Sequence, residues 1–151
     1  MLDLAFQNLT ADKSFKEGFF VNILNVCVKE LGLDKKKVEI SVNLVGNDKI
    51  KILNKKHRNK NKVTDVLSFP LQEKLEIGNW KLEILPLGDI FISLPFAKKE
   101  AKSENVSIDR KLVHLAVHGF LHLAGYDHER SENKADKMFR LEKKILSKVG
   151  S

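Results

Sequence analysis

Three histidines within eleven residues are the side chains whose types and spacing best suit chemistry. They are His118, His122 and His128, in the segment HGFLHLAGYDH. Residues four apart on a helix lie about 40° apart around its axis and about 6 Å apart along it, so the first two can meet one ion. Gly125 is placed to end that helix, and a turn there can bring His128 back toward the same point. The spacing predicts a metal site with three imidazole ligands.

Three protein ligands leave one tetrahedral position for water, which is typical of a catalytic zinc site and not of a structural one. Two of the histidines lie in an otherwise apolar helix, where imidazoles without a partner would be costly to bury. Imidazole also binds nickel, copper and iron, but zinc is the preferred assignment. We therefore expect a metal-dependent hydrolase that holds one Zn²⁺ per chain.

Three neighbours of the histidines bear on the chemistry. His114 lies one turn before His118 on the same stripe, and we expect it to support a ligand or to pack in the core. Asp127 either accepts the free N–H of a ligand imidazole or caps the turn. Gly119 stands where the helix motif of zinc proteases has a glutamate general base, so peptide hydrolysis would lack its usual base.

A basic segment forms a second candidate site. Asn54–Lys62 (NKKHRNKNK) holds five cationic side chains and no acid, and it directly precedes Thr64–Pro70 (TDVLSFP). The segment is either a loop that faces phosphate or a merely soluble loop. Arg58 is its best candidate for function, because a guanidinium can donate two hydrogen bonds to a phosphate as negative charge develops on it. Thr64 and Asp65 have no obvious ligand geometry, and we expect them to hold their strand beside the metal helix.

Length and composition favour one soluble domain over residues 1–151. Apolar residues make up 42% of the chain and charged residues 31%, enough for a core under a solvated surface. We expect a cytoplasmic protein, because no apolar run approaches the roughly 18 residues of a membrane span. The single cysteine, Cys27, is expected to be a packed, inert thiol. A formal charge of +7 favours an anionic partner such as nucleic acid, although charge alone is weak support.

Periodicity and turn signals predict the elements that position these residues. Ser14 and Glu17 have the spacing of a capping box at the start of the first helix, and Gly32 is placed to end that helix. The expected strands are 2–6, 38–44, 64–69 and 89–93; the expected helices are 15–31, 48–58 with Asn47 as its cap, 95–101, 108–123 and 135–146. Residues 71–83 suggest an irregular hairpin. The order predicts an α+β fold, with a small mixed sheet of four strands covered by about five helices and the metal site at the end of a buried central helix.

With these residues identified, the chain resembles the YbeY family of bacterial endoribonucleases. The resemblance rests on His118–His128 in full, on Thr64–Pro70, on Leu87–Ile90, and on Leu53-Asn54 with Arg58, all in the family's order. It implies one α+β domain, a zinc ion held by the three histidines, and cleavage of single-stranded RNA with the arginine assisting at the phosphate. It also implies a role in maturing the 3′ end of small-subunit ribosomal RNA and in ribosome quality control, with the small subunit and its proteins as partners.

Carried over residue by residue, the resemblance implies metal ligation by His118, His122 and His128 and catalysis by Arg58 with the first two histidines. Zinc would polarise or deprotonate a water molecule or steady the scissile phosphate, and a ribose 2′-hydroxyl is an alternative nucleophile. Two other functions stay open. One is a metal-dependent protease or amide hydrolase; the other is a non-catalytic ribosome-assembly factor with a structural zinc.

Overall fold

The computed structural model describes residues 1–71, 83–126 and 132–149. Its elements are β1 (Leu2–Asn8), α1 (Glu17–Glu30), β2 (Lys37–Val45), α2 (Asn47–Arg58), β3 (Val66–Pro70), β4 (Ile84–Ser93), α3 (Leu94–Glu104), α4 (Ile108–Leu123) and α5 (Glu132–Val149). Within the described residues these are four strands and five helices, as the periodicity predicted. Most of the expected hairpin, together with Asp127 and His128, lies outside the described residues.

The four strands form one mixed sheet in the order β1-β2-β4-β3. β1 runs parallel to β2 and β2 runs parallel to β4, whereas β3 is antiparallel to β4 and lies at an edge. Alternation along β2 buries Val38, Val42 and Leu44 on one face of the sheet, in keeping with the period of a strand. The predicted α+β fold with a mixed sheet is confirmed.

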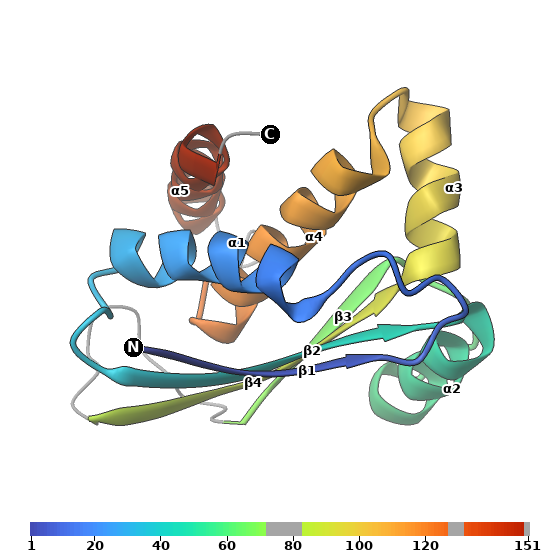
Figure 1. The fold of residues 1–151 in the computed structure, drawn as a ribbon, viewed down its shortest axis with the longest axis horizontal. Coiled ribbons are helices and arrows are strands. Elements are labelled where there is room, and N and C mark those ends of the chain that lie inside the picture. Colours follow the sequence, from blue (N-terminus) through green and yellow to red (C-terminus); the bar gives the residue numbers. More distant parts are fainter. Residues whose placement is uncertain (72–82, 127–131, 150–151) are drawn as a thin grey trace.

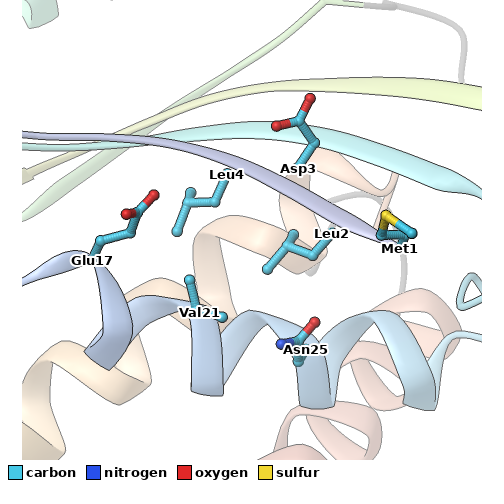
Figure 2. Close-up of a pocket in the computed structure, with 7 residues that line it drawn as sticks. All are labelled: Met1, Leu2, Asp3, Leu4, Glu17, Val21 and Asn25. Atoms are coloured by element: carbon cyan, nitrogen blue, oxygen red, sulfur yellow. The ribbon is translucent and has the colours of Figure 1, made fainter.

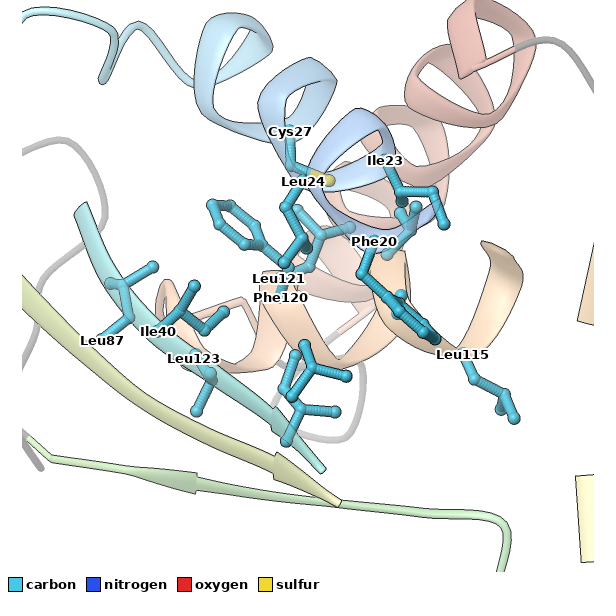
Figure 3. Close-up of a cluster of buried hydrophobic side chains, with 14 of the residues drawn as sticks. Phe20, Ile23, Leu24, Cys27, Ile40, Leu87, Leu115, Phe120, Leu121 and Leu123 are labelled. Carbon is cyan, nitrogen blue, oxygen red and sulfur yellow. The ribbon is translucent and has the colours of Figure 1, made fainter. Parts of the chain in front are cut away.

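Helices cover the two faces of the sheet unequally (Figure 1). α1, α3, α4 and α5 lie on one face, and the main hydrophobic core lies between α1, α4 and the sheet (Figure 3). α2 lies on the other face, where Ile50 packs with Val45 and Leu67 in a smaller cluster. This arrangement places α4 centrally, between the strands on one side and α1 and α5 on the other.

The residues that begin the helices differ from expectation at α1 and at α2, where Gly46 and not Asn47 is the N-cap residue and no side chain caps the helix. Ser107 and Ser93 cap α4 and α3 by accepting hydrogen bonds from backbone N–H groups. The predicted capping box at Ser14 is wrong, because Asp12 accepts hydrogen bonds from both the Ser14 hydroxyl and its backbone N–H. α1 begins instead after Lys16, without a side-chain cap. A local carboxylate therefore competes successfully for the serine.

Two further expectations concern burial. Cys27 is fully buried on the core side of α1, so the prediction of a packed thiol is confirmed. None of the described helices combines the length and the apolar composition needed to cross a membrane.

Candidate metal centre

The C-terminal half of α4 brings two of the predicted ligands together. The Nε2 atoms of His118 and His122 lie 3.0 Å apart, and the ring centroids lie 4.5 Å apart. Both side chains are only partly buried; His118 is 28% exposed. The rest of this half of the helix is apolar and buried, as predicted, so the two imidazoles are a partly exposed polar pair near the end of a buried helix.

The histidine pair fits two positions of a zinc site. Zinc–nitrogen bonds of about 2.0–2.1 Å in a tetrahedron place two ligand nitrogens about 3.3 Å apart. The observed pair presents the same atom, Nε2, from both rings at close to that spacing. Two nitrogen lone pairs at this distance repel each other unless a proton or a cation lies between them. The donor set therefore suits a cation that prefers imidazole.

No group of three histidine, cysteine or acidic side chains converges as a metal site within residues 1–71, 83–126 and 132–149. The third predicted ligand, His128, lies outside those ranges. Its ligation, and the zinc itself, stay predictions.

A carboxylate that the sequence patterns did not single out lies beside the pair. Glu142 of α5 has Oε1 2.8 Å from His114 Nε2 and Oε2 3.4 Å from His118 Nδ1. Burial raises the pKa of Glu142, but hydrogen bonds and charges from the two histidines outweigh burial and lower the pKa to about 2. A signal existed in the sequence, since Glu142 shares a helical stripe with the buried Met138 and Ile145.

His114 occupies the place expected for a supporting residue. It lies one turn before His118 on α4, and its side chain is 53% exposed. Its ring contacts Glu142 and is not buried in the core, so the core alternative is wrong.

Arg58 ends α2 and contacts the edge strand of the sheet. Its Nη2 donates a hydrogen bond to the backbone oxygen of Ser68, at 3.4 Å. β3, which contains Ser68, is also packed against α4. Among the described residues, the structure thus brings His118 and His122 together. Arg58 does not join this pair; it contacts β3, and β3 in turn contacts the histidine helix α4.

Asn54 explains how the basic segment is held. Its side chain is 2% exposed, and Nδ2 donates a hydrogen bond of 3.0 Å to the backbone oxygen of Lys62. Its own backbone oxygen accepts from the Lys60 N–H. The loop after α2 is therefore closed on a buried amide, while Lys55, Lys56, Lys60 and Lys62 are exposed to solvent.

The motif residue Asp65 has a structural role, although its contacts are with β3 and β4 and not with the histidine helix that we expected. Its Oδ1 accepts a hydrogen bond of 2.7 Å from the Val66 N–H, and its backbone oxygen accepts one from Ser93. These contacts hold the start of β3 against the end of β4. Burial, together with a hydrogen bond to Asp65, raises the pKa of Glu100 on α3, and Lys111 partly offsets the shift.

A pocket between β1 and α1 is separate from these residues. Leu2, Leu4 and Val21 line it from the strand and the helix, and Glu17 lies at one end (Figure 2). Asp3 is the other charged residue of the lining. None of the lining residues belongs to the histidine pair, to Glu142 or to the basic segment, so this pocket is not part of the candidate site.

Comparisons with known proteins agree with this fold. A family model described as Endoribonuclease YbeY matches residues 5–150. Endoribonuclease YbeY of Persephonella marina is 40% identical over 140 residues, which cover 93% of this chain and 88% of the relative. Endoribonuclease YbeY of Oenococcus oeni is 48% identical over 118 residues, covering 77% of this chain and 75% of the relative.

The solution structure of a Thermotoga maritima protein shares the fold, with a TM-score of 0.64 and 29% identity. The alignment covers 96% of this chain and 89% of that chain. A family model over nearly the whole chain and relatives at this identity leave one conclusion: the chain belongs to the YbeY family of endoribonucleases.

Proposed function

We propose that this protein is a zinc-dependent endoribonuclease that cleaves single-stranded RNA. Membership of the family supports RNA as the substrate. The observation that carries the metal-dependent part is the pairing of His118 and His122, whose Nε2 atoms lie 3.0 Å apart in a partly exposed position. The net charge of +7 and the exposed lysines after Asn54 favour a polyanionic substrate.

In this proposal His118, His122 and His128 hold one zinc ion. When bound, zinc supplies a Lewis acid at the scissile phosphate or lowers the pKa of water to about 7. Arg58 offsets the negative charge that builds on the phosphoryl oxygens, which is the task to which a guanidinium fork is suited. The nucleophile is either water or the ribose 2′-hydroxyl; a 5′-phosphate product identifies the first and a cyclic phosphate identifies the second.

The packing of α4 gives a reason to prefer RNA over a peptide substrate. The glutamate base of zinc proteases would have to stand at residue 119, and a Cβ there would lie 3.1–3.2 Å from three side-chain atoms of Ile90. A glutamate at this buried position would require Ile90 or α4 to move. The helical histidine pair, which is the main argument for a protease, therefore has no glutamate general base beside it.

The biological role that we propose is maturation of the 3′ end of small-subunit ribosomal RNA, together with ribosome quality control in the cytoplasm. Its partners would be ribosomal RNA, the small ribosomal subunit and the proteins associated with that subunit. Family membership supports this role. A test in cells is the amount of unprocessed small-subunit RNA after replacement of the natural gene by the His122→Ala variant.

The direct test combines metal content with RNA cleavage. Zinc per chain is measured by mass spectrometry for the wild type and for the His122→Ala and Arg58→Ala variants. Each variant has a matched control: for zinc content, His57→Ala removes a histidine outside α4 whose ring lies tilted against that of Phe69, and for cleavage, Arg110→Ala removes an exposed arginine at the opposite end of α4. All proteins are purified stringently against contaminating nucleases.

We expect one zinc per wild-type chain, loss of zinc in His122→Ala alone, and loss of cleavage in both test variants, while His57→Ala keeps its zinc and Arg110→Ala keeps zinc and cleavage. Zinc with equal cleavage in all folded variants would overturn the nuclease. It would favour the assembly factor with a structural metal. If the protein cleaved casein and chelation abolished that cleavage, the protease alternative would be supported instead.

A further inference from the structure

Glu142 links the histidine helix to α5 through two different imidazoles. Its Oε1 lies 2.8 Å from His114 Nε2, and its Oε2 lies 3.4 Å from His118 Nδ1. The carboxylate side chain is only 13% exposed, between α4 and α5. We propose that Glu142 is a positioning residue that fixes the ring and the tautomer of His118, so that its Nε2 binds the metal. This inference rests on the proposed zinc site and adds the residue that prepares it.

The direction of the contact follows from hydrogen-bond chemistry. An ionised carboxylate can only accept, so the neutral His118 ring must carry its proton on Nδ1. Nε2 then keeps its lone pair, directed toward His122 Nε2. The opposite tautomer would place a proton where the metal must bind. A carboxylate behind the ring thus favours the ligating form and also increases the basicity of the ligand nitrogen.

His114 completes the arrangement by holding the carboxylate. The contact between His114 and Glu142 is the shorter of the two, so the 2.8 Å hydrogen bond sets the orientation of the carboxylate and leaves Oε2 facing His118. This gives His114 a role without making it a ligand. Removing His114 should therefore weaken metal binding less than removing Glu142 does.

Packing of α5 keeps Glu142 in place. Met138 and Ile145, on the same stripe of α5, are fully buried in the main core. The carboxylate therefore approaches α4 from a docked helix and not from a loop. Glu142 lies 24 residues from His118 in the chain, so only the packing of α5 on α4 brings the two together.

Glu30 offers a matched control. It is also a largely buried glutamate that joins two helices, with a side chain 9% exposed, but its partners are Lys144 and Lys148 of α5. The Glu30→Gln variant should weaken the docking of α5 without touching a histidine. Comparison of Glu142→Gln with Glu30→Gln thus separates a positioning role from general support of α5.

The first measurement is the zinc dissociation constant, by competition with a chromogenic chelator. We expect affinity to fall about 10- to 100-fold in Glu142→Ala, the range typical of lost partners to metal-binding histidines. Glu142→Gln should fall less, because its amide oxygen still accepts one N–H. His114→Ala should fall by less than Glu142→Ala, and Glu30→Gln should bind like the wild type. Folding of each variant is checked by circular dichroism.

The second measurement is the tautomer of His118 in zinc-free protein, by nitrogen-15 NMR of the imidazoles. We expect a proton on Nδ1 in the wild type and in Glu30→Gln, and a mixture in Glu142→Ala. Zinc affinity and tautomer unchanged in folded Glu142 variants would overturn this inference while leaving the zinc nuclease intact. A wild type that binds no zinc would instead remove the proposed site, and this inference with it.

Discussion

Ile90 on β4 lies directly against Gly119 on α4. A Cβ added at Gly119 would lie 3.1 Å from Ile90 Cδ1 and 3.2 Å from both Cγ atoms. The missing side chain thus lets the helix approach the sheet between the two histidines of the candidate site. The close approach of α4 to β4 therefore depends on glycine, which has only a hydrogen atom where other residues have a Cβ. His118 directly precedes Gly119 in the chain, so this contact also sets how close the histidine pair lies to the sheet.

Gly119→Ala should lower the free energy of unfolding, despite the better helix propensity of alanine. Alanine gains up to about 1 kcal/mol within a helix. Overpacking of a core costs about 1–3 kcal/mol, because Ile90 or the helix must move. Urea unfolding measures the balance.

The double variant tests whether Ile90 is the cause. Ile90→Val removes one crowding atom and usually costs about 0.5–1.5 kcal/mol in a well-packed core. We expect it to cost less when it is combined with Gly119→Ala than when it is made in the wild type, because the two residues are in contact. Strict additivity of the two substitutions would contradict this account of the contact.

Removal of metal should lower the melting temperature of the wild type. Zinc at about 100 times its dissociation constant stabilises a native state by about 2.7 kcal/mol if it binds only that state. For a domain of this size, that corresponds to a shift of about 5–10 °C. Calorimetry before and after chelation, with zinc added back, measures the shift. His118→Ala should melt at one temperature in all three conditions; an unchanged wild-type melt would argue against the site.

The Glu30 cluster should make stability depend on acid pH. A hydrogen bond from Lys148 lowers the pKa of Glu30; burial opposes this effect, and the charges of Lys148 and Lys144 add to it. Because the folded pKa is depressed, the stabilisation is present above the unfolded value near 4.5 and is lost as pH falls through the folded pKa.

We expect Glu30→Gln to be less stable than the wild type at neutral pH and to approach it as the pH falls toward about 3, below the unfolded pKa of a glutamate. Urea midpoints across this range measure the difference. High salt should reduce the difference at neutral pH, since lysine charges exposed to solvent are screened. A gap between the two proteins that stays constant with pH would show that the carboxylate charge contributes nothing.

Cys27 should resist alkylation in the folded protein. Burial raises the pKa of its thiol to about 12, and only the thiolate is strongly nucleophilic. Iodoacetamide at about pH 8 should therefore label the native chain very slowly and label it completely in denaturant. Mass spectrometry over time distinguishes the two states. Rapid labelling without denaturant would mean that α1 opens far more often than its packing suggests.

Asn54→Ala should loosen the basic loop. It removes a partly buried hydrogen bond to the Lys62 carbonyl, and the loss of such a bond typically costs about 0.5–1.5 kcal/mol. Trypsin should then cleave after Lys60 or Lys62 faster than in the wild type, because the loop opens more often. Asn61→Ala, at an exposed position of the same loop, serves as the control. Equal rates in all three proteins would show that Asn54 does not close the loop.

Local spacing in the sequence was sufficient to predict the elements and the histidine pair. Gly32 and Ser107 mark a helix end and a helix start by chemistry that acts within a few residues, and both predictions are confirmed. The meeting of His118 with His122 is equally local, because a helix brings residues four apart to one face wherever it lies. For such local features, the spacing of residues in the sequence is enough to predict how their side chains lie relative to one another.

Tertiary structure alone decided the features that depend on distant segments. Glu142 reaches His118 only because α5 folds back on α4, and Gly119 has a packing role only because β4 places Ile90 beneath it. The end of α2 contacts β3 because the helix stops beside this edge strand. Each of these contacts joins separate elements, and their positions follow from burial of the shared core. Hydrophobic burial has no preferred direction, so it determines which faces are covered but leaves no record in the sequence of which side chains will meet.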